Sequence, residues 1–524
     1  MFLVILAPMG RAASRSSRGT GRRGTVATVL GVVSAALAGF GFAGEENVAA
    51  ARGVVAPRSA APVQADAAGG KPRVLVLSDI GNEPDDQMSL VRFLVYSNEF
   101  DVEGLVATTS TWQKTAVRPD IMHRVIDAYG EVQPNLLKHA KGFPTALELK
   151  RLVRSGPPEY GMAAVGDRGI SPGAELILQA ADRSDTRPLW ITVWGGANTL
   201  AQALRHAGAT RSPAALEELV SRLRVYSISD QDDAGPWIRR EFPSLLYVVS
   251  PSTPDGAQYY FATWTGISGD QYYRNAPGAS FRTVTNEWLE ANVRSKGPLG
   301  AAYPKYLFIM EGDTPSFLNL IGNGLAGHLD PSWGGWGGRY VHRQSYGETR
   351  PIWTQGGDAY PGRGNSRDTV TGADGKVYTS DQATIWRWRE AFQHDFAARM
   401  DWTIKDVNEV NHNPVVVLNG RHGNEPVMVD TEVGRPVTLD PAGTSDPDGD
   451  ALRFTWFSYP EAGSGVPGQS IAGVTLENDG QDSVKVTPTS PGVAHVVLAV
   501  EDAGSPSLTS YRRILVNVQP APPR

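Results

Sequence analysis

RVLVLSDIGNEPDD, residues 73–86, is the stretch of sequence that decides the expected fold. It opens with a continuous apolar run at residues 74–77, which is typical of a strand buried on both faces of a parallel sheet. An acidic loop follows, and apolar residues then recur at helical spacing from about Asp86: Met88, Leu90, Val91, Leu94 and Val95. The stretch therefore predicts a buried strand, a charged turn and a helix.

Strand-like and helix-like segments alternate after this opening. The strand-like runs are residues 102–108, 189–194, 224–228 and 245–249, and the helix-like runs are residues 118–129 and 200–207. This alternation favours an α/β domain with a mostly parallel sheet flanked by helices. Ligands of such domains bind beyond the carboxyl ends of the strands, so polar motifs at those ends are the candidate functional residues.

The acidic loop is the strongest of these motifs. Asp79, Glu83, Asp85 and Asp86 place four carboxylates within eight residues. They repel one another in a partly dehydrated loop unless protons or a cation offset the charge. A hard divalent cation such as calcium, which takes about six to eight oxygen ligands, fits best. The alternative is a solvated acidic turn at the N-terminus of the helix, where the helix dipole favours negative charge.

A second polar motif follows the predicted strand at residues 224–228. It reads SDQDDAGPW, residues 229–237. Hydroxyl-rich ligands are held by carboxylates and amides beside an aromatic face, so we expect Gln231, Asp232 and Trp237 to bind the ligand. The alternative is a charged loop that precedes a helix.

An aromatic, glycine-rich loop is expected at residues 331–340, PSWGGWGGRY. Its three aromatic residues and four glycines pack poorly as a core element, whereas flat rings stack on sugars. We expect Trp333, Trp336 and Arg339 to line the ligand cleft, and the alternative is packing at the edge of the sheet. The surrounding region, residues 328–380, has no clear period and is predicted to form long loops.

The C-terminal part predicts a second, all-β domain. A helix over residues 381–400, capped by Ser380, closes the α/β domain. Short β-type runs follow: residues 415–418, 427–429, 436–439, 452–456, 483–486, 494–500 and 514–518. Turn residues separate them, which favours an immunoglobulin-like β-sandwich over residues 413–520. The acidic turn at residues 440–450 predicts either a calcium site or a plain turn.

The N-terminal residues have the pattern of an export signal. An arginine-rich segment, residues 11–23, precedes a weakly apolar run at residues 26–43 that offers small residues for cleavage. We therefore expect a signal at residues 1–44, a flexible spacer at residues 45–72 and a secreted protein. The paired arginines leave the twin-arginine route open. The alternative is an uncleaved membrane anchor.

Composition narrows the function classes. The chain of 524 residues exceeds what one hydrophobic core usually organises, so two folded units are expected. A formal net charge of −6 argues against nucleic acid as the partner. The chain has no cysteine, which excludes disulfides, thiolate metal sites and a cysteine nucleophile.

The strand, acidic loop and helix resemble the opening of nucleoside hydrolases, whose signature is D-x-D-P-G-x-D-D. The longer stretch SDIGNEPDDQMSLVRFLVYSNEFDVEGLVATTSTWQ, residues 78–113, is closer still to a secreted branch of that superfamily, the nucleoside hydrolase-like cellulose-binding proteins. The resemblance covers residues 73–405 and extends to the C-terminal sandwich. The loop departs from the signature, because it is two residues longer and Leu77 stands where the first aspartate is expected.

The resemblance also implies roles for individual residues. Asp79 would activate water, and calcium would be held by carboxylates of the loop and of EGDTPSF, residues 311–317: Asp79, Glu83, Asp85, Asp86 and Asp313. Superfamily members carry a histidine before the late aspartate, near the leaving base. This chain has no histidine there, so Glu311 becomes the candidate acid.

The resemblance further implies that VWGGANTL, residues 193–200, supplies a backbone carbonyl to the metal and Asn198 to a sugar. Glycines in this segment permit close backbone approach. We expect Asn82 of the acidic loop to join the substrate contacts. The alternative is an ordinary strand-to-helix turn capped by Asn198.

Two functions remain after these assignments. The first is a calcium-dependent hydrolase of an N- or O-linked glycosidic bond, and the aspartate cluster favours it because a pure binder has little need for such costly charge. The second is a non-catalytic protein that binds plant polysaccharide, which the missing histidine favours. A surface-anchored structural module ranks last. Fold alone does not separate these possibilities.

Overall fold

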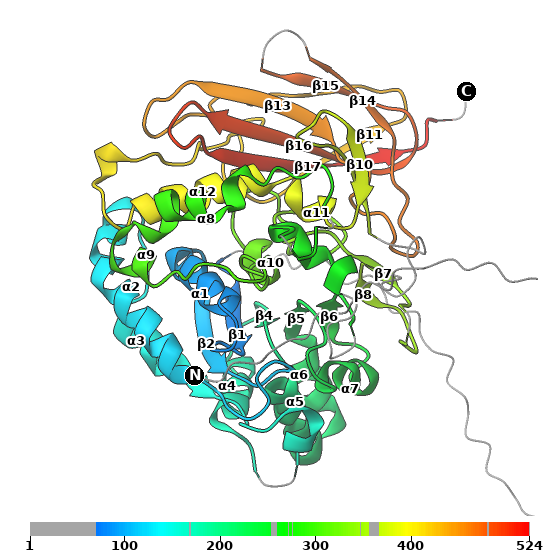
Figure 1. Cartoon of the computed structure of the whole chain (residues 1–524). Coiled ribbons are helices and arrows are strands. Elements are labelled where there is room, and N and C mark those ends of the chain that lie inside the picture. Colours follow the sequence, from blue (N-terminus) through cyan, green and yellow to red (C-terminus); the bar gives the residue numbers. More distant parts are fainter. Residues whose placement is uncertain are drawn as a thin grey trace, which may run out of the picture. The chain divides into compact units, whose positions relative to one another are not determined.

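A computed structural model describes residues 70–166, 169–252, 259–270, 272–274, 276–345, 347–355, 366–478 and 482–522 (Figure 1). All of these residues belong to one compact unit. The predicted export signal and nearly all of the predicted spacer lie outside the described residues. Among the described helices, none has the length and apolar character needed to cross a membrane.

An eight-stranded sheet lies at the centre of the larger domain, with the order β3-β2-β1-β4-β5-β6-β8-β7. Neighbouring strands are parallel except β7, which pairs antiparallel with β8. The strands are β1 (Arg73–Ser78), β2 (Asp101–Ala107), β3 (Val153–Ser155), β4 (Leu189–Val193), β5 (Leu223–Ser227), β6 (Leu246–Val249), β7 (Val341–Arg343) and β8 (Ile352–Thr354). The predicted mostly parallel sheet is confirmed.

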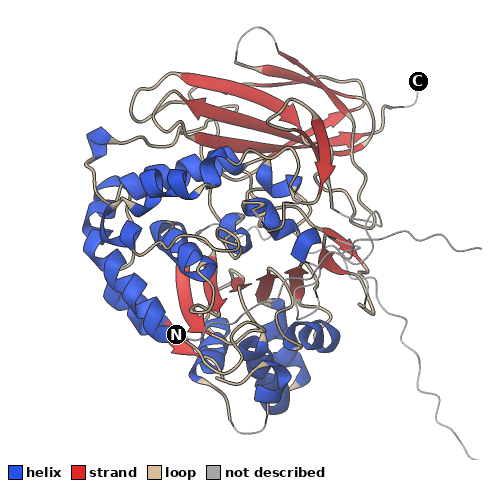
Figure 2. Ribbon diagram, viewed as in Figure 1, coloured by secondary structure: helices blue, strands red, loops and turns tan. Residues whose placement is uncertain are grey.

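Helices cover both faces of this sheet (Figure 2). Alternate residues of β1 explain why its apolar run is continuous: Val74 and Val76 join one buried cluster, and Leu75 and Leu77 join the other. The helices are α1 (Asp85–Val95), α2 (Pro119–His139), α3 (Ala146–Leu152), α4 (Pro172–Ala181), α5 (Asn198–Thr210), α6 (Pro213–Ser221), α7 (Ala234–Glu241), α8 (Asn286–Leu289), α9 (Gly297–Ala301), α10 (Pro315–Leu318), α11 (Ala383–Trp386) and α12 (Arg389–Asp401).

The C-terminal part forms a four-stranded sheet, β11-β17-β16-β13, and a three-stranded sheet, β12-β15-β14. The strands are β11 (Val427–Glu432), β12 (Val437–Leu439), β13 (Leu452–Ser458), β14 (Val474–Asn478), β15 (Val484–Pro488), β16 (Gly492–Asp502) and β17 (Thr509–Gln519). Residues of both sheets share one core, including Leu439, Val484 and Val496. The predicted all-β domain is confirmed, and its immunoglobulin-like type stays a prediction.

Four details differ from the sequence-based expectations. Residues 415–418 form only isolated bridges, and β14 was not expected. The region predicted to be loops contains β7, β8 and the hairpin of β9 (Asp368–Thr371) and β10 (Val377–Ser380). The helix expected over residues 381–400 is divided into α11 and α12, because Trp388 leaves helical geometry between them (φ −102°, ψ 0°).

Candidate functional site

Three buried carboxylates converge at the carboxyl end of β1. Asp85 and Asp86 begin α1, and Asp313 lies in the turn before α10. One oxygen of each lies within 4.8 Å of the others. The Oδ2 atom of Asp313 is buried and has no hydrogen-bond partner among the described residues. An unpartnered acceptor among converging carboxylates fits a hard cation with oxygen ligands, so these three residues could hold one.

Burial and mutual repulsion raise the pKa values of this cluster. Burial, followed by the charge of Asp79, raises the pKa of Asp85 to about 7, and the same causes raise the pKa of Asp86 well above its ordinary value. Burial and the neighbouring carboxylates also raise the pKa of Asp313 well above its ordinary value. Glu83 is less buried, and burial with the charge of Asp85 raises its pKa to about 8. The cluster is therefore electrostatically unbalanced without a cation or protons.

Asp79 lies beside the three converging carboxylates and outside the group that could share one ion. It follows β1, where the strand order changes direction between β2 and β4. A side chain at Gly195 would place its Cβ 2.5 Å from Asp79 Oδ1, so the glycine leaves room for this carboxylate. Burial raises the pKa of Asp79 to about 6, and a hydrogen bond with Ser110 opposes the shift. The group can accept a proton near neutral pH.

A row of aromatic rings borders the carboxylates and was missed by the sequence analysis. The centroid of the Tyr259 ring lies 6.4 Å from that of Trp112 and 5.2 Å from that of Trp264, which in turn lies 6.1 Å from Tyr273. A Cβ at Gly312 would be 2.8 Å from Asp85 Oδ2 and 3.1 Å from the Trp264 ring, which places the row against the cluster. Trp112 follows β2, but Tyr259, Trp264 and Tyr273 lie far beyond β6 and carried no comparable positional signal.

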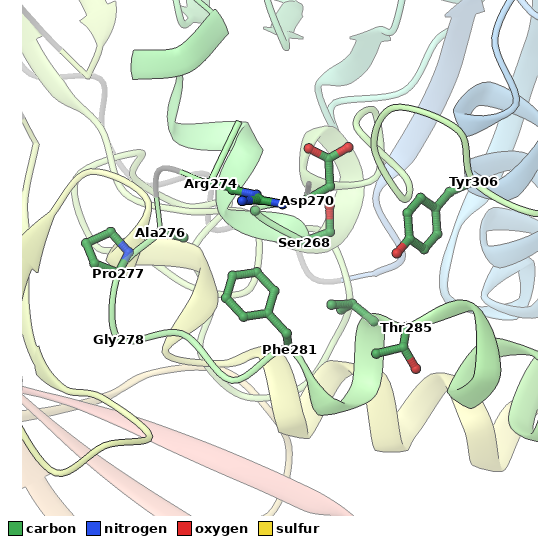
Figure 3. A pocket seen from close by; sticks show the side chains of 11 residues that line it. Ser268, Asp270, Arg274, Ala276, Pro277, Gly278, Phe281, Thr285 and Tyr306 are labelled. Atoms are coloured by element: carbon green, nitrogen blue, oxygen red, sulfur yellow. The ribbon is translucent and has the colours of Figure 1, made fainter. Parts of the chain in front are cut away.

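Asp270 was also missed, and it extends the acidic site toward a cavity of about 380 Å³ (Figure 3). Its Oδ1 atom accepts hydrogen bonds from the backbone N–H groups of Tyr272 and Tyr273, at 3.0 and 3.1 Å. Its Oδ2 atom is buried without a hydrogen-bond partner among the described residues. The charge of Asp270 contributes to the raised pKa of Asp85, so the two carboxylates are close enough to interact.

Three of the predicted ligand-binding residues instead connect the loops at the strand ends. Asn198 donates to Thr109 Oγ1 and to the Glu159 carbonyl, both at 2.9 Å. Asp232 accepts from the backbone N–H groups of Asn198 and Ala234, each at 3.0 Å. The amide of Gln231 donates to the Trp194 carbonyl, and its Oε1 atom has no hydrogen-bond partner among the described residues. Of these three side chains, Gln231 is the one with a buried acceptor that has no partner in the described part of the chain.

The remaining acidic-loop residues lie nearer to solvent than the aspartates. Asn82 is exposed, and Glu83 is partly exposed. Both side chains follow Gly81, whose φ of +122° turns the backbone sharply. They remain available to a ligand at the mouth of the site.

The assignment of Glu311 as a catalytic acid is corrected by its surroundings. Its side chain is fully buried and forms an ion pair with Arg92. Its oxygens also accept hydrogen bonds from Tyr303, at 2.6 Å, and from Thr314, at 2.9 Å. A carboxylate enclosed by these donors stabilises the core and has no access to a leaving group.

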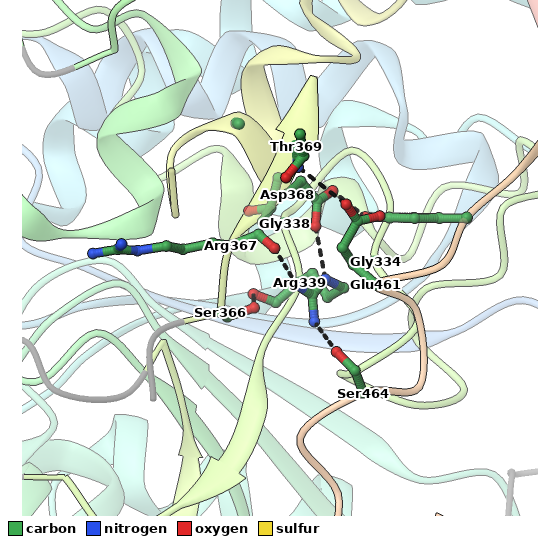
Figure 4. Close-up of polar contacts among 12 residues, drawn as sticks. Gly334, Gly338, Arg339, Ser366, Arg367, Asp368, Thr369, Glu461 and Ser464 are labelled. Carbon is green, nitrogen blue, oxygen red and sulfur yellow. Dashed lines mark hydrogen bonds and ion pairs between the residues drawn. The ribbon is translucent and has the colours of Figure 1, made fainter. Parts of the chain in front are cut away.

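The expected aromatic cleft loop is also corrected, because it packs against the β-sandwich. Trp336 is 1% exposed and contacts Phe392 and Tyr511. Trp333 lies against His495. Arg339 is buried in an ion pair with Asp368 and donates to Ser464 (Figure 4). The loop does not follow a strand, and its aromatic faces are used between the two domains.

Trp237 is likewise placed away from the carboxylates. It lies on α7, its ring is 5.8 Å from that of Phe242, and it packs against the second buried cluster of the sheet. The residue therefore packs against the helices of the fold and is partly exposed.

The sheet topology and the acidic strand-end site define a nucleoside hydrolase-like α/β protein. A family model described as "Cellulose-binding Sde182, nucleoside hydrolase-like domain" matches residues 73–340. A second model, "Cellulose-binding protein Sde0182, C-terminal domain", matches residues 436–518. The chain belongs to the Sde182 nucleoside hydrolase-like family, which confirms the resemblance inferred from the acidic loop.

A solved structure from Saccharophagus degradans supports this membership. It is described as a nucleoside hydrolase-related hypothetical protein associated with carbohydrate metabolism. It shares 36% identity with this chain, covers 86% of this chain and 100% of its own, and has a TM-score of 0.72. The type III effector XopQ, at 13% identity over 64% of this chain and 95% of its own, has a TM-score of only 0.29. No curated protein matches the chain significantly.

Proposed function

We propose that this protein is an exported, calcium-dependent hydrolase that cleaves a glycosidic bond in a sugar-containing substrate. The observation that carries the proposal is the convergence of Asp85, Asp86 and Asp313 within 4.8 Å, beside a fourth buried carboxylate, Asp79. An all-oxygen ligand set suits calcium. The family description and the association of the S. degradans relative with carbohydrate metabolism support a carbohydrate partner.

The chain's own residues divide the chemistry between them. Asp85, Asp86 and Asp313 would hold the cation, and Glu83, like Asp79, lies outside this converging group. A bound cation would orient water and sugar hydroxyls and make the water more acidic. Asp79 would accept the proton of the attacking water, since a pKa of about 6 leaves it mostly ionised at neutral pH and still basic. The aromatic row would exclude bulk water and pack against the sugar.

A non-catalytic carbohydrate-binding protein is the second candidate. The observation that favours it is the enclosure of Glu311 by Arg92 and Tyr303, which removes the predicted leaving-group acid from the site. A substrate with a good leaving group would not need that acid. Activity on activated glycosides and nucleosides therefore separates the two candidates.

A calorimetric calcium titration of chelator-treated protein tests the metal site first. We expect one calcium site in the wild type. In Asp86→Asn the calcium affinity should fall by about a hundredfold or more. Changes to groups that only orient metal ligands already cost about 10- to 100-fold, and a direct ligand should cost at least as much. Asp374→Asn, in the exposed turn between β9 and β10, is the matched control and should bind normally. Equal affinities for Asp86→Asn and wild type would contradict the proposal.

The raised pKa values also predict how pH affects the metal-free protein. A carboxyl whose pKa is higher in the folded state binds more protons when folded. It therefore favours folding at low pH, and this contribution is lost as pH rises through the folded-state pKa. The pKa of Asp85 is near 7 and that of Glu83 is near 8, so the stabilisation by calcium should grow between about pH 5 and pH 8.

The measurement is the melting temperature with calcium minus that with chelator, followed across this pH range. Taking the difference removes groups that titrate equally in both states, such as the buried His495, whose pKa is lowered by burial and by Arg513. Asp86→Asn should show almost no difference at any pH. A calcium effect that shrinks toward pH 8 would count against the cluster.

A further inference from the structure

The cavity beside Asp270 has the composition of a carbohydrate pocket. Its volume of about 380 Å³ lies within the range of pockets that enclose small ligands. Aromatic, hydroxyl and charged side chains line it together: Ser268, Asp270, Arg274, Phe281, Thr285 and Tyr306. Figure 3 shows Phe281 and Tyr306 on opposite sides of a space that Asp270 also borders. Aromatic faces that flank hydrogen-bond acceptors suit a sugar ring, because its hydroxyls can donate to those acceptors.

The carboxylate of Asp270 in this pocket is held in place and can accept a further hydrogen bond. Asp270 is only 7% exposed, and two backbone N–H groups hold its Oδ1 atom in place. Its Oδ2 atom has no hydrogen-bond partner among the described residues. Leaving a buried acceptor unsatisfied is costly, whereas a sugar hydroxyl would donate to it directly.

The aromatic wall of the pocket is also held in place. The guanidinium of Arg389 lies 5.4 Å from the centroid of the Phe281 ring. Arg389 is itself fixed, because it donates to the carbonyls of Ser280 and Gly266 at 2.6 and 2.7 Å. A ring held in this way loses little conformational freedom when a ligand stacks on it.

Several exposed aromatic side chains come from the same stretch of the chain as the pocket. Among the described residues, the large exposed aromatic side chains are Trp112, Tyr260, Phe261, Tyr272, Phe281 and Phe308. All but Trp112 come from the chain between residues 260 and 308, which also contributes most of the pocket. Tyr272 and Phe308 pack together with ring centroids 5.3 Å apart. Exposed apolar side chains that are concentrated in one region are typical of a binding surface.

The pocket lies close to the carboxylate cluster. Tyr273 follows Asp270 closely in the chain, and its ring packs against Trp264, which in turn borders Asp85. The charges of both Asp270 and Asp85 raise the pKa of Tyr273, after burial. Asp270 therefore links the pocket to the cluster, since it lines the pocket and lies close enough to Asp85 to interact with it.

We propose that this cavity is a second carbohydrate subsite, which binds the sugar unit next to the one held at the Asp85–Asp86–Asp313 cluster. The substrate is then an oligosaccharide or polysaccharide with an O-linked bond, rather than a nucleoside. This inference rests on the proposed function, because it assumes a sugar at the cluster. Asp270 accepts a hydroxyl of the second unit, and Phe281 and Tyr306 pack against its faces.

The test measures binding of glucose, cellobiose and cellotriose to the calcium-saturated full chain by calorimetry. We expect the wild-type affinity to rise with ligand length. Tyr306→Ala and Phe281→Ala should each lose about tenfold in affinity for the longer ligands and leave glucose binding unchanged. Leu147→Ala, at an exposed position on α3, is the control and should match the wild type.

Calcium titration of every variant separates the two proposals. If calcium binds and the pocket variants match the wild type for all lengths, the subsite is overturned and the proposed function stands. If Tyr306→Ala weakens inosine or uridine binding instead, the pocket holds a base and the inference is also overturned. If the wild type binds no calcium, the proposed function itself fails.

Discussion

Replacing Asp79 with asparagine is expected to lower the rate of glycosidic bond cleavage by at least about a hundredfold, while calcium affinity changes by less than about tenfold. Asparagine has nearly the same size and keeps the fit over Gly195, but it cannot accept a proton from water. Asp79 is outside the group of carboxylates that could share one ion, so the metal site should survive. Initial rates on the substrate found by screening, measured beside calcium titrations, test both parts.

The pH profile of the same reaction provides an independent test of the base. A base with a pKa of about 6 must be ionised to act, so the rate should rise with pH through about 6. The hydrogen bond with Ser110 lowers the pKa of Asp79, and Ser110→Ala should therefore shift this rise to higher pH. Retention of the rate by Asp79→Asn within a few-fold would rule out this role and favour the non-catalytic candidate.

The topology of the sheet explains why these carboxylates meet. β1 pairs with β2 on one side and with β4 on the other, so the chain leaves β1 in one direction and later returns on its other side. The loops after β1 and β4 separate at this point and leave room at the sheet edge. Asp79 and Gly195 occupy these two loops. Asp313 reaches the same place from a much later segment, before α10.

Local sequence patterns were enough to predict one part of the site. An apolar run followed by an acidic loop identified β1, α1 and the pair Asp85 and Asp86 without any tertiary information. Asp313 was identified only through the resemblance, because its turn follows no strand. Asp270 and Trp264 carry no comparable signal. Trp264 lies in a short 3-10 helix, Thr263–Ile267, and Asp270 follows it, and the position of both depends on the packing of residues distant in the chain.

The incorrect assignments have a physical explanation as well. Glycine and tryptophan in residues 331–340 indicate a ring-rich loop but do not specify what the rings contact. In this protein the contact is the C-terminal domain, whose Tyr459 and Tyr511 join the same buried cluster as Trp336. Glu311 was assigned by position alone, and the partner that encloses it, Arg92, lies on α1. Composition does not reveal such pairings between distant segments.

The contact between the two domains includes a closed network of buried charges around Asp368. Arg339 donates to its Oδ1 atom and Arg387 to its Oδ2 atom, both at 2.8 Å, and the Tyr459 hydroxyl also donates to Oδ2. Burial opposes ionisation of this group, but Arg339 and Arg387 hold the pKa of Asp368 below its ordinary value. The carboxylate therefore stays charged and balances Arg339 and Arg387. Figure 4 shows its contact with Arg339.

Replacing Asp368 with alanine is expected to lower the free energy of unfolding by about 3–5 kcal/mol, because it leaves buried cationic side chains without their counter-charge. Chemical denaturation of the full chain measures the change. Asp374→Ala, in the exposed turn of the same hairpin, is the matched control and should leave the free energy of unfolding nearly unchanged. Calcium affinity of Asp368→Ala should be unchanged, since the network is separate from the Asp85–Asp86–Asp313 cluster. A loss below about 1 kcal/mol for Asp368→Ala would mean that water reaches the two arginines and that the domains are held together mainly by their shared apolar core.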